Sequence, residues 1–218
     1  MIGASLLTGC ARSPSTLPPP VRELTMEIAF AEPANWNYYY FFAIDADGDE
    51  ADGPVPIIGG GPFWTGSWFN GWGIISNTDP PEEPSDYIMY RAGVFQQFHQ
   101  GTFVGIPFRR SVSDGGRRLS VTIDLDLVTT TINTLDVNFI TVDDIIPPQV
   151  GMRENYDALG DIGNDYISVP IDYSYQSGVD NSTACAGGSS SCENDQEVKP
   201  LDLSLDIVDW SVTVNLPD

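Results

Sequence analysis

The feature that most constrains the fold is an alternation of apolar and polar residues with a period of two. The clearest stretch is 119–127, LSVTIDLDL, in which five aliphatic side chains fall on one face and every intervening residue is polar. Successive side chains of a strand point to opposite faces of its sheet, so this stretch predicts a strand with one buried face. A second strand is predicted over 24–30, where four apolar residues share a face: Leu24, Met26, Ile28 and Phe30.

The last alternating stretch of the chain changes phase by one residue. Its apolar residues fall into two sets, first Leu203, Leu205 and Ile207, then Trp210, Val212 and Val214. One extra residue inside a strand shifts the phase in this way, so we expect a β-bulge between 207 and 210.

Further strands are separated by short turn signals. The predicted strands are 38–44, 86–91, 94–99, 137–142 and 166–173. Residues 91–93 (RAG) and 113–116 (SDGG) are typical of tight hairpin turns, because Gly and Asp tolerate left-handed backbone. No helical periodicity extends over ten residues or more.

These patterns predict a single all-β domain over 22–218. Gly occupies 21 positions and Pro 17, which suits a fold rich in turns rather than a helical bundle. Eight or so strands with one apolar face each favour two antiparallel sheets packed face to face. We therefore expect an antiparallel β-sandwich, jelly-roll or immunoglobulin-like, with long Gly/Pro-rich loops.

The three cysteines indicate an exported protein. Cys10 ends the sequence LTGC, which resembles a bacterial lipobox, although a chance match is the alternative. Residues 1–9 are too short and lack the basic start of a complete secretory signal, so we expect 1–10 to be a truncated lipoprotein signal. Residues 11–21 would then be a Ser/Pro-rich linker. Cys185 and Cys192 lie in a Ser/Gly-rich loop and are expected to form a disulfide.

The chain is strongly acidic, with a formal net charge of −22. Such a surface repels phosphate groups, so we expect no nucleic-acid partner, and contact with a membrane only through the lipid anchor. The localisation predicted is extracytoplasmic, at the outer membrane or the cell surface.

One acidic run could bind calcium. In 45–53, DADGDEADG, alternating carboxylates could converge on a hard cation, with Asp45, Asp47, Asp49 and Asp52 as ligands. The alternative is turn formation alone, in which Asp side chains accept hydrogen bonds from nearby backbone N–H groups.

An aromatic run over 59–73 is the candidate ligand site. Trp64, Trp68 and Trp72 recur every four residues, but six glycines and a proline argue against a helix. Exposed, these rings could stack on sugars or anchor a protein partner. The alternative is that they pack over one end of the sandwich as a satellite cluster.

A basic island surrounds the turn at 113–116. It consists of Arg109, Arg110, Arg117 and Arg118. Lipid headgroups or an anionic glycan could face it, but we expect these arginines to pair with the protein's own carboxylates.

No sequence motif indicates a particular enzymatic reaction. His99 is the only histidine, which excludes a multi-histidine zinc site, and no GxSxG elbow is present. A carboxylate pair for glycoside hydrolysis stays open, because the separation of acidic side chains is invisible in sequence. We expect a protein that is not an enzyme.

The run 38–47, YYYFFAIDAD, resembles the second-strand region of DOMON-like sandwiches, a group that includes carbohydrate-binding modules of the family 9 type. The segments 87–91, 137–139 and 209–214 look compatible with later strands of that group. The resemblance implies sugar or haem binding, often with structural calcium. Haem-binding members use Met and His as axial ligands, for which Met89 and His99 are the obvious pair here; we do not expect haem.

Two functions follow as hypotheses. The first is a lipid-anchored, non-catalytic binding module for carbohydrate, with calcium stiffening the acidic loop. The alternative is a structural or assembly protein of the cell surface that engages a protein partner through its aromatic loop. Long edge strands unprotected by charge, or a large apolar surface, would favour the alternative.

Overall fold

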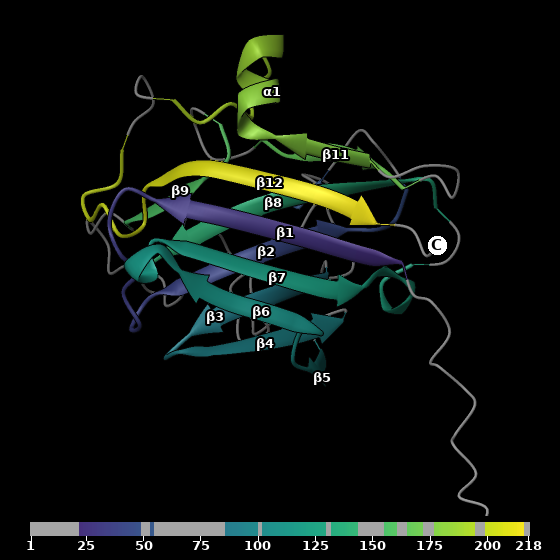
Figure 1. Ribbon diagram of the computed structural model, residues 1–218, viewed down its shortest axis with the longest axis horizontal. Coiled ribbons are helices and arrows are strands. Elements are labelled where there is room, and N and C mark those ends of the chain that lie inside the picture. Colours follow the sequence, from purple (N-terminus) through teal and green to yellow (C-terminus); the bar gives the residue numbers. More distant parts are fainter. Residues whose placement is uncertain are drawn as a thin grey trace, which may run out of the picture.

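The computed structural model is a β-sandwich of two antiparallel sheets (Figure 1). The structure describes residues 22–48, 53–54, 86–99, 102–129, 132–143, 155–160, 165–171, 177–194 and 199–215. Over these residues the predicted all-β antiparallel sandwich is confirmed. The predicted anchor and linker, 1–21, and the aromatic run lie outside the described residues.

The two sheets use strands from both halves of the chain. Sheet A has the order β11-β12-β1-β7-β6. Its strands are β1 (Glu23–Phe30), β6 (Arg109–Ser113), β7 (Arg118–Asp124), β11 (Ser177–Asp180) and β12 (Ile207–Asn215). Sheet B has the order β10-β8-β2-β3-β4-β5, and β9 also pairs with β8. Its strands are β2 (Tyr39–Asp45), β3 (Asp86–Arg91), β4 (Val94–His99), β5 (Thr102–Gly105), β8 (Thr134–Val142), β9 (Tyr156–Ala158) and β10 (Ile167–Pro170).

The inner faces of both sheets form the main core. Its fully buried side chains include Met26 and Ile28 of β1, Val121 of β7 and Phe139 of β8. Met26, Ile28 and Val121 are positions that the alternation predicted, because burying one face of a strand removes a continuous apolar surface from water. Trp210 completes this core from β12, with its ring 6.2 Å from that of Phe139.

The central strands of sheet B, β2 and β8, are buried on both faces, which explains why β2 lacks any alternation. Tyr40, Phe42 and Ile44 belong to the main core, whereas the intervening Phe41 and Ala43 belong to a second apolar cluster on the outer face. That outer cluster also contains Tyr39, Tyr87, Ile140, Val142 and Ala158. A strand covered on both sides reads as a continuous apolar run, as YYFFAI does.

The stretch 119–127 is a strand only over its first part. Strand β7 ends at Asp124, and a single 3₁₀ turn, η3 (Leu125–Leu127), follows it. The Asp124 carboxylate accepts a hydrogen bond from the Asp126 N–H and so starts this turn. Leu125 is buried, but Leu127 is 63% exposed, so the prediction of five inward-facing aliphatics is wrong for Leu127.

The predicted β-bulge is confirmed at Val208. Ala29 of β1 pairs with Asp209, yet the next residue, Phe30, pairs with Ile207, so Val208 is the extra residue. The bulge restores the inward phase, and Trp210, Val212 and Val214 are all buried. Leu203 precedes β12 and is partly exposed, so it does not share the buried face expected for it.

Both predicted hairpin turns are confirmed. Ala92 and Gly93, with φ values of 52° and 78°, connect β3 to β4. Asp114 and Gly115, with φ values of 50° and 64°, lie between β6 and β7. The only α-helix in the described part of the chain is short, α1 (Asn181–Gly187). Among these residues no helix has both the length and the apolar character required to cross a membrane.

Alkaline pH should unfold the domain through its buried phenols. Burial raises the pKa of Tyr40 to about 12, although hydrogen bonds with Asn35 and Ser204 partly oppose the shift. Burial also raises the pKa of Tyr87. An unfolded tyrosine has a pKa near 10, so this contribution to stability is complete below pH ~10 and is lost as pH rises toward ~12. We expect Tyr40→Phe to reduce the loss of stability between these pH values, measured by urea unfolding at each pH. An unchanged pH dependence in Tyr40→Phe would contradict this assignment.

Candidate functional site

The sandwich has two lateral sides, each formed by one edge strand of sheet A and one edge strand of sheet B. The two sides differ in which other residues lie beside these edge strands. On one side the edge strands β10 and β11 lie together, next to α1. On the other side the edge strands are β5 and β6, which are joined by the three residues 106–108. Figure 1 places α1 and β5 at opposite ends of the view.

Helix α1 begins where β11 ends. The Asp180 carboxylate accepts hydrogen bonds from the Thr183 N–H and the Ser182 hydroxyl, which is the usual role of an N-cap aspartate. The pKa of Asp180 lies below its ordinary value. The hydrogen bond from Ser182 is the largest cause, and the hydrogen bond from Thr183 is the second. The helix ends at Gly187. The next residue, Gly188, has a φ of 69°, the left-handed conformation expected at a helix C-terminus.

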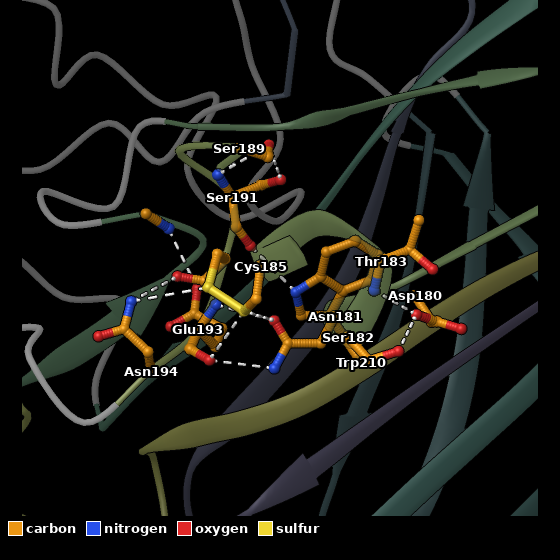
Figure 2. The surroundings of a disulfide bond; sticks show 12 residues. Asp180, Asn181, Ser182, Thr183, Cys185, Ser189, Ser191, Glu193, Asn194 and Trp210 are labelled. Atoms are coloured by element: carbon orange, nitrogen blue, oxygen red, sulfur yellow. Dashed lines mark hydrogen bonds between the residues drawn. A yellow bond between two sulfur atoms is a disulfide. The ribbon is translucent and has the colours of Figure 1, made fainter. Parts of the chain in front are cut away.

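The predicted disulfide between Cys185 and Cys192 is present (Figure 2). It joins the last turn of α1 to the segment that returns toward the core. The Ser/Gly-rich segment 183–192 was expected to be a loop, but its first part, up to Gly187, belongs to α1. Its composition does not predict this helix, because the helix depends on the Asp180 cap and on tertiary contacts rather than on propensity.

Buried hydrogen bonds attach the disulfide segment to both sheets. The Asn181 side chain accepts from the Glu193 N–H at 2.9 Å and donates to the Glu193 carbonyl at 3.0 Å. The Glu193 carboxylate accepts from the Gly160 N–H, next to β9 of sheet B. The Trp210 indole donates to the Ser191 carbonyl at 3.1 Å, from β12 of sheet A. Figure 2 shows Asn181 and Glu193 facing each other beside the disulfide.

A groove of about 290 Å³ lies between β10 and this segment. It is lined by Tyr166, Ile167, Ser168, Val179, Thr183, Ala184, Gly187, Ser189 and Ser191. Ile167 and Ala184 are buried and form an apolar floor, and five lining residues carry hydroxyl groups. None of the lining residues that the structure describes is charged, although the whole chain has a net charge of −22.

Several of the groove hydroxyls are held in place. Ser168 donates to the Asp136 carboxylate at 2.5 Å, which leaves its oxygen lone pairs available to accept a hydrogen bond. Ser189 and Ser191 bond to each other at 2.8 Å. Gly53 packs against the Tyr166 ring, since a Cβ at Gly53 would lie 2.5 Å from Tyr166 Cγ. The groove therefore offers fixed hydroxyls above an apolar floor.

A second hollow of about 370 Å³ lies on the other side of β11. It is lined by Ser177, Gly178, Val179, Asp180, Ser211 and Thr213. The two hollows share Val179, but this one contains the Asp180 carboxylate and is therefore less suited to a neutral ligand.

The acidic run is only partly described. The Asp45 carboxylate accepts from the Asp47 N–H at 3.1 Å, which is an Asx turn that needs no metal. Asp49 and Asp52 lie outside the described residues. Among the residues that the structure covers, no group of three or more His, Cys, Asp or Glu could hold a metal ion. The calcium site stays a prediction.

The predicted aromatic and lipid sites also lie outside the described residues, namely Trp64, Trp68, Trp72 and Cys10. The structure therefore does not place them.

Met89 and His99 do not converge on one ligand. Met89 lies on β3 with the outer cluster of sheet B. The His99 Nδ1 atom lies 2.9 Å from the carboxylate of Asp86, which is three residues before Met89 and so points to the other face of the strand. In the described part of the chain His99 has Asp86 as its hydrogen-bond partner, and no serine or cysteine completes a nucleophilic triad there.

Two of the four arginines in the basic island form ion pairs with carboxylates. Arg109 lies 2.7 Å from Glu23, and Arg118 pairs with Glu27 and, at 3.3 Å, with Asp209. The prediction of internal ion pairs is confirmed for these two residues. Arg110 donates instead to the Pro107 carbonyl, at 3.5 Å.

The second lateral side of the sandwich is apolar and exposed. We call the residues 102–113, which contain β5 and β6, the apolar edge. It contains five large apolar side chains that are each about half exposed: Phe103, Val104, Ile106, Phe108 and Val112. Exposed apolar residues are common singly, but a group of them along two edge strands and the residues that join them is typical of an interaction surface.

Comparisons of the chain with protein-family models, with curated proteins and with solved structures gave no match. The resemblance to DOMON-like sandwiches therefore stays a prediction.

Sequence reasoning did not find the groove or the apolar edge. The groove residues come from two segments, 166–168 and 179–191, and serines in a loop have no periodic signal. A signal for the edge was present, because the twenty residues 94–113 contain no Asp or Glu in a chain with 31 of them.

Removing the disulfide should destabilise the domain by roughly 2–3 kcal/mol, the loop-closure entropy of a link spanning seven positions. We expect the double variant Cys185→Ser, Cys192→Ser to show this decrease in its free energy of unfolding in urea. The reduced wild-type protein should match the variant, and a reductant should leave the variant unchanged. A decrease below ~0.5 kcal/mol would mean that the Asn181 and Glu193 hydrogen bonds alone hold the segment.

Proposed function

We propose that this protein is an exported, lipid-anchored and non-catalytic binding module for carbohydrate, and that its ligand lies in the groove beside the disulfide. The observation that carries the proposal is the chemistry of the groove. Its described residues combine an apolar floor with a rim of hydroxyl groups, and none of them is charged, in a strongly acidic protein.

A sugar ring matches this combination. Its C–H faces are apolar and its hydroxyls lie at the rim, where they both donate and accept hydrogen bonds. Serine and threonine hydroxyls also do both, whereas carboxylates only accept. An anionic ligand would find no cation among the described residues that line the groove. The volume of about 290 Å³ is at the small end for ligand sites.

The rigidity of the groove supports binding. The disulfide, the Asp180 cap and the buried Asn181–Glu193 pair fix one wall, and the pairing of β10 with β8 fixes the other. A site that is already ordered loses less conformational entropy when its ligand binds.

The disulfide also supports export, since such bonds persist in oxidising compartments. In this proposal Cys10 carries the lipid, and the linker 11–21 holds the domain away from the membrane. Calcium bound by Asp45, Asp47, Asp49 and Asp52 would stiffen the loop after β2.

The aromatic run remains the alternative location for the glycan, through Trp64, Trp68 and Trp72. The alternative function, an assembly protein of the cell surface, draws its support from a different surface, the apolar edge.

Filling the groove should abolish binding without disturbing the fold. A Cβ at Gly187 meets nothing within 4 Å, so Gly187→Leu places a side chain at the groove without a clash at its base. We expect one class of polysaccharide to retard the full chain in affinity electrophoresis, and Gly187→Leu to weaken that binding at least ~10-fold, about 1.4 kcal/mol. The control is Ala186→Leu, which adds a similar side chain at an exposed position of α1 outside the groove lining.

Three outcomes would redirect the proposal. Loss of binding in Trp68→Ala but not in Gly187→Leu would move the site to the aromatic run. Loss in EDTA alone would show that the acidic loop shapes the site. Retardation by no polysaccharide would contradict carbohydrate binding.

A further inference from the structure

We propose that the apolar edge is a self-association surface, in which β6 pairs antiparallel with β6 of a second copy and extends sheet A across the two molecules. This inference does not depend on the groove or on its ligand. It rests on the burial pattern of β6, on the local charge and on the order of residues along the strand.

Strand β6 carries an apolar residue on the core side that the monomer does not bury. Val112 pairs with Leu119 and Arg110 with Val121, both of which are core residues of β7. Val112 and Arg110 therefore face the same side of sheet A as the core, yet Val112 is 46% exposed. One further strand beside β6 would cover it.

The strand also has an open hydrogen-bonding edge among the described residues. There β6 pairs with β7 alone, and β5 pairs with β4 alone. Unpaired N–H and C=O groups on an edge strand form a ready template for another strand. Phe108 and Ile106, beside β6, would add apolar contacts to such a pairing.

The local charge lowers the electrostatic repulsion that a second copy meets at this edge. Two molecules of net charge −22 repel each other over most of their surfaces. The twenty residues 94–113 carry no carboxylate, whereas 109–118 holds four of the nine basic residues. Two copies can therefore approach here with less repulsion than elsewhere.

The order of residues along β6 is self-complementary. The strand and the residue after it read Arg109-Arg110-Ser111-Val112-Ser113-Asp114. In an antiparallel pair centred on Ser111, Arg110 lies opposite Val112 of the second copy, and its aliphatic stem can cover that side chain. Arg109 lies opposite Ser113 of the second copy, next to Asp114, and opposite charges so placed stabilise strand pairing.

Two-fold symmetry gives a sharp test, because only the central residue meets its own copy. In the full chain with Cys10→Ser, we expect Ser111→Cys to cross-link into dimers with a short bifunctional thiol reagent. Ser113→Cys, on the same strand and equally exposed, lies opposite Arg109 and should cross-link at least ~10-fold less, in line with the separation of strand neighbours.

Sedimentation equilibrium tests the same surface without cysteines. We expect a concentration-dependent dimer that Val112→Lys weakens at least ~10-fold. The control, Leu201→Lys, makes the same kind of change at an exposed leucine away from the edge and should leave the dimer intact. Near-UV circular dichroism of the buried Trp210 reports whether each variant is folded.

Two results would overturn the inference. A folded chain that stays monomeric at every concentration would contradict self-association, even if the edge then bound anionic vesicles or another protein. Equal cross-linking of Ser111→Cys and Ser113→Cys would contradict the antiparallel pairing centred on Ser111.

Discussion

The packing of the two inner sheet faces is the interaction on which the rest of the molecule depends. The main core joins β1, β7 and β12 of sheet A to β2, β3 and β8 of sheet B, and nearly all of its side chains are aliphatic or aromatic. Because a side chain on a strand alternates between faces, the core fixes the register of the strands that contribute side chains to it. The bulge at Val208 follows from this requirement, since it returns Trp210 to the core side after the phase change.

A sandwich packed in this way leaves two lateral sides, and this chain treats them differently. Beside β10 and β11, the segment 181–193 is held by a disulfide and by hydrogen bonds from both sheets. It lines a groove whose described residues are uncharged. Beside β5 and β6 the strand edges and several large apolar residues remain exposed. A covered edge can offer a rigid small-molecule site, whereas an open one offers backbone and apolar surface to another strand.

Much of the fold could be predicted because it rests on local patterns. Alternation predicted β1 and β7, the turns at 92–93 and 114–115 fixed two hairpins, and the phase change predicted the bulge. The sequence patterns did not predict the local structure where tertiary or capping contacts determine it. Leu127 left the strand because Asp124 caps a turn, and α1 formed in a Ser/Gly-rich segment because Asp180 and Cys192 hold it. The groove could not be predicted, since its hydroxyls come together only through the fold.

The central claim is that one side of the sandwich is closed within the monomer and the other is open. Amide hydrogen exchange of the full chain at low and high protein concentration tests it most directly. The account predicts that the amides of β12, inside sheet A, are protected at both concentrations. The outward-facing amides of β6 should exchange quickly in dilute solution and become protected only when the protein is concentrated. Amides of β6 as protected as those of β12 in dilute solution would contradict the claim, because the edge would then be covered within a single molecule.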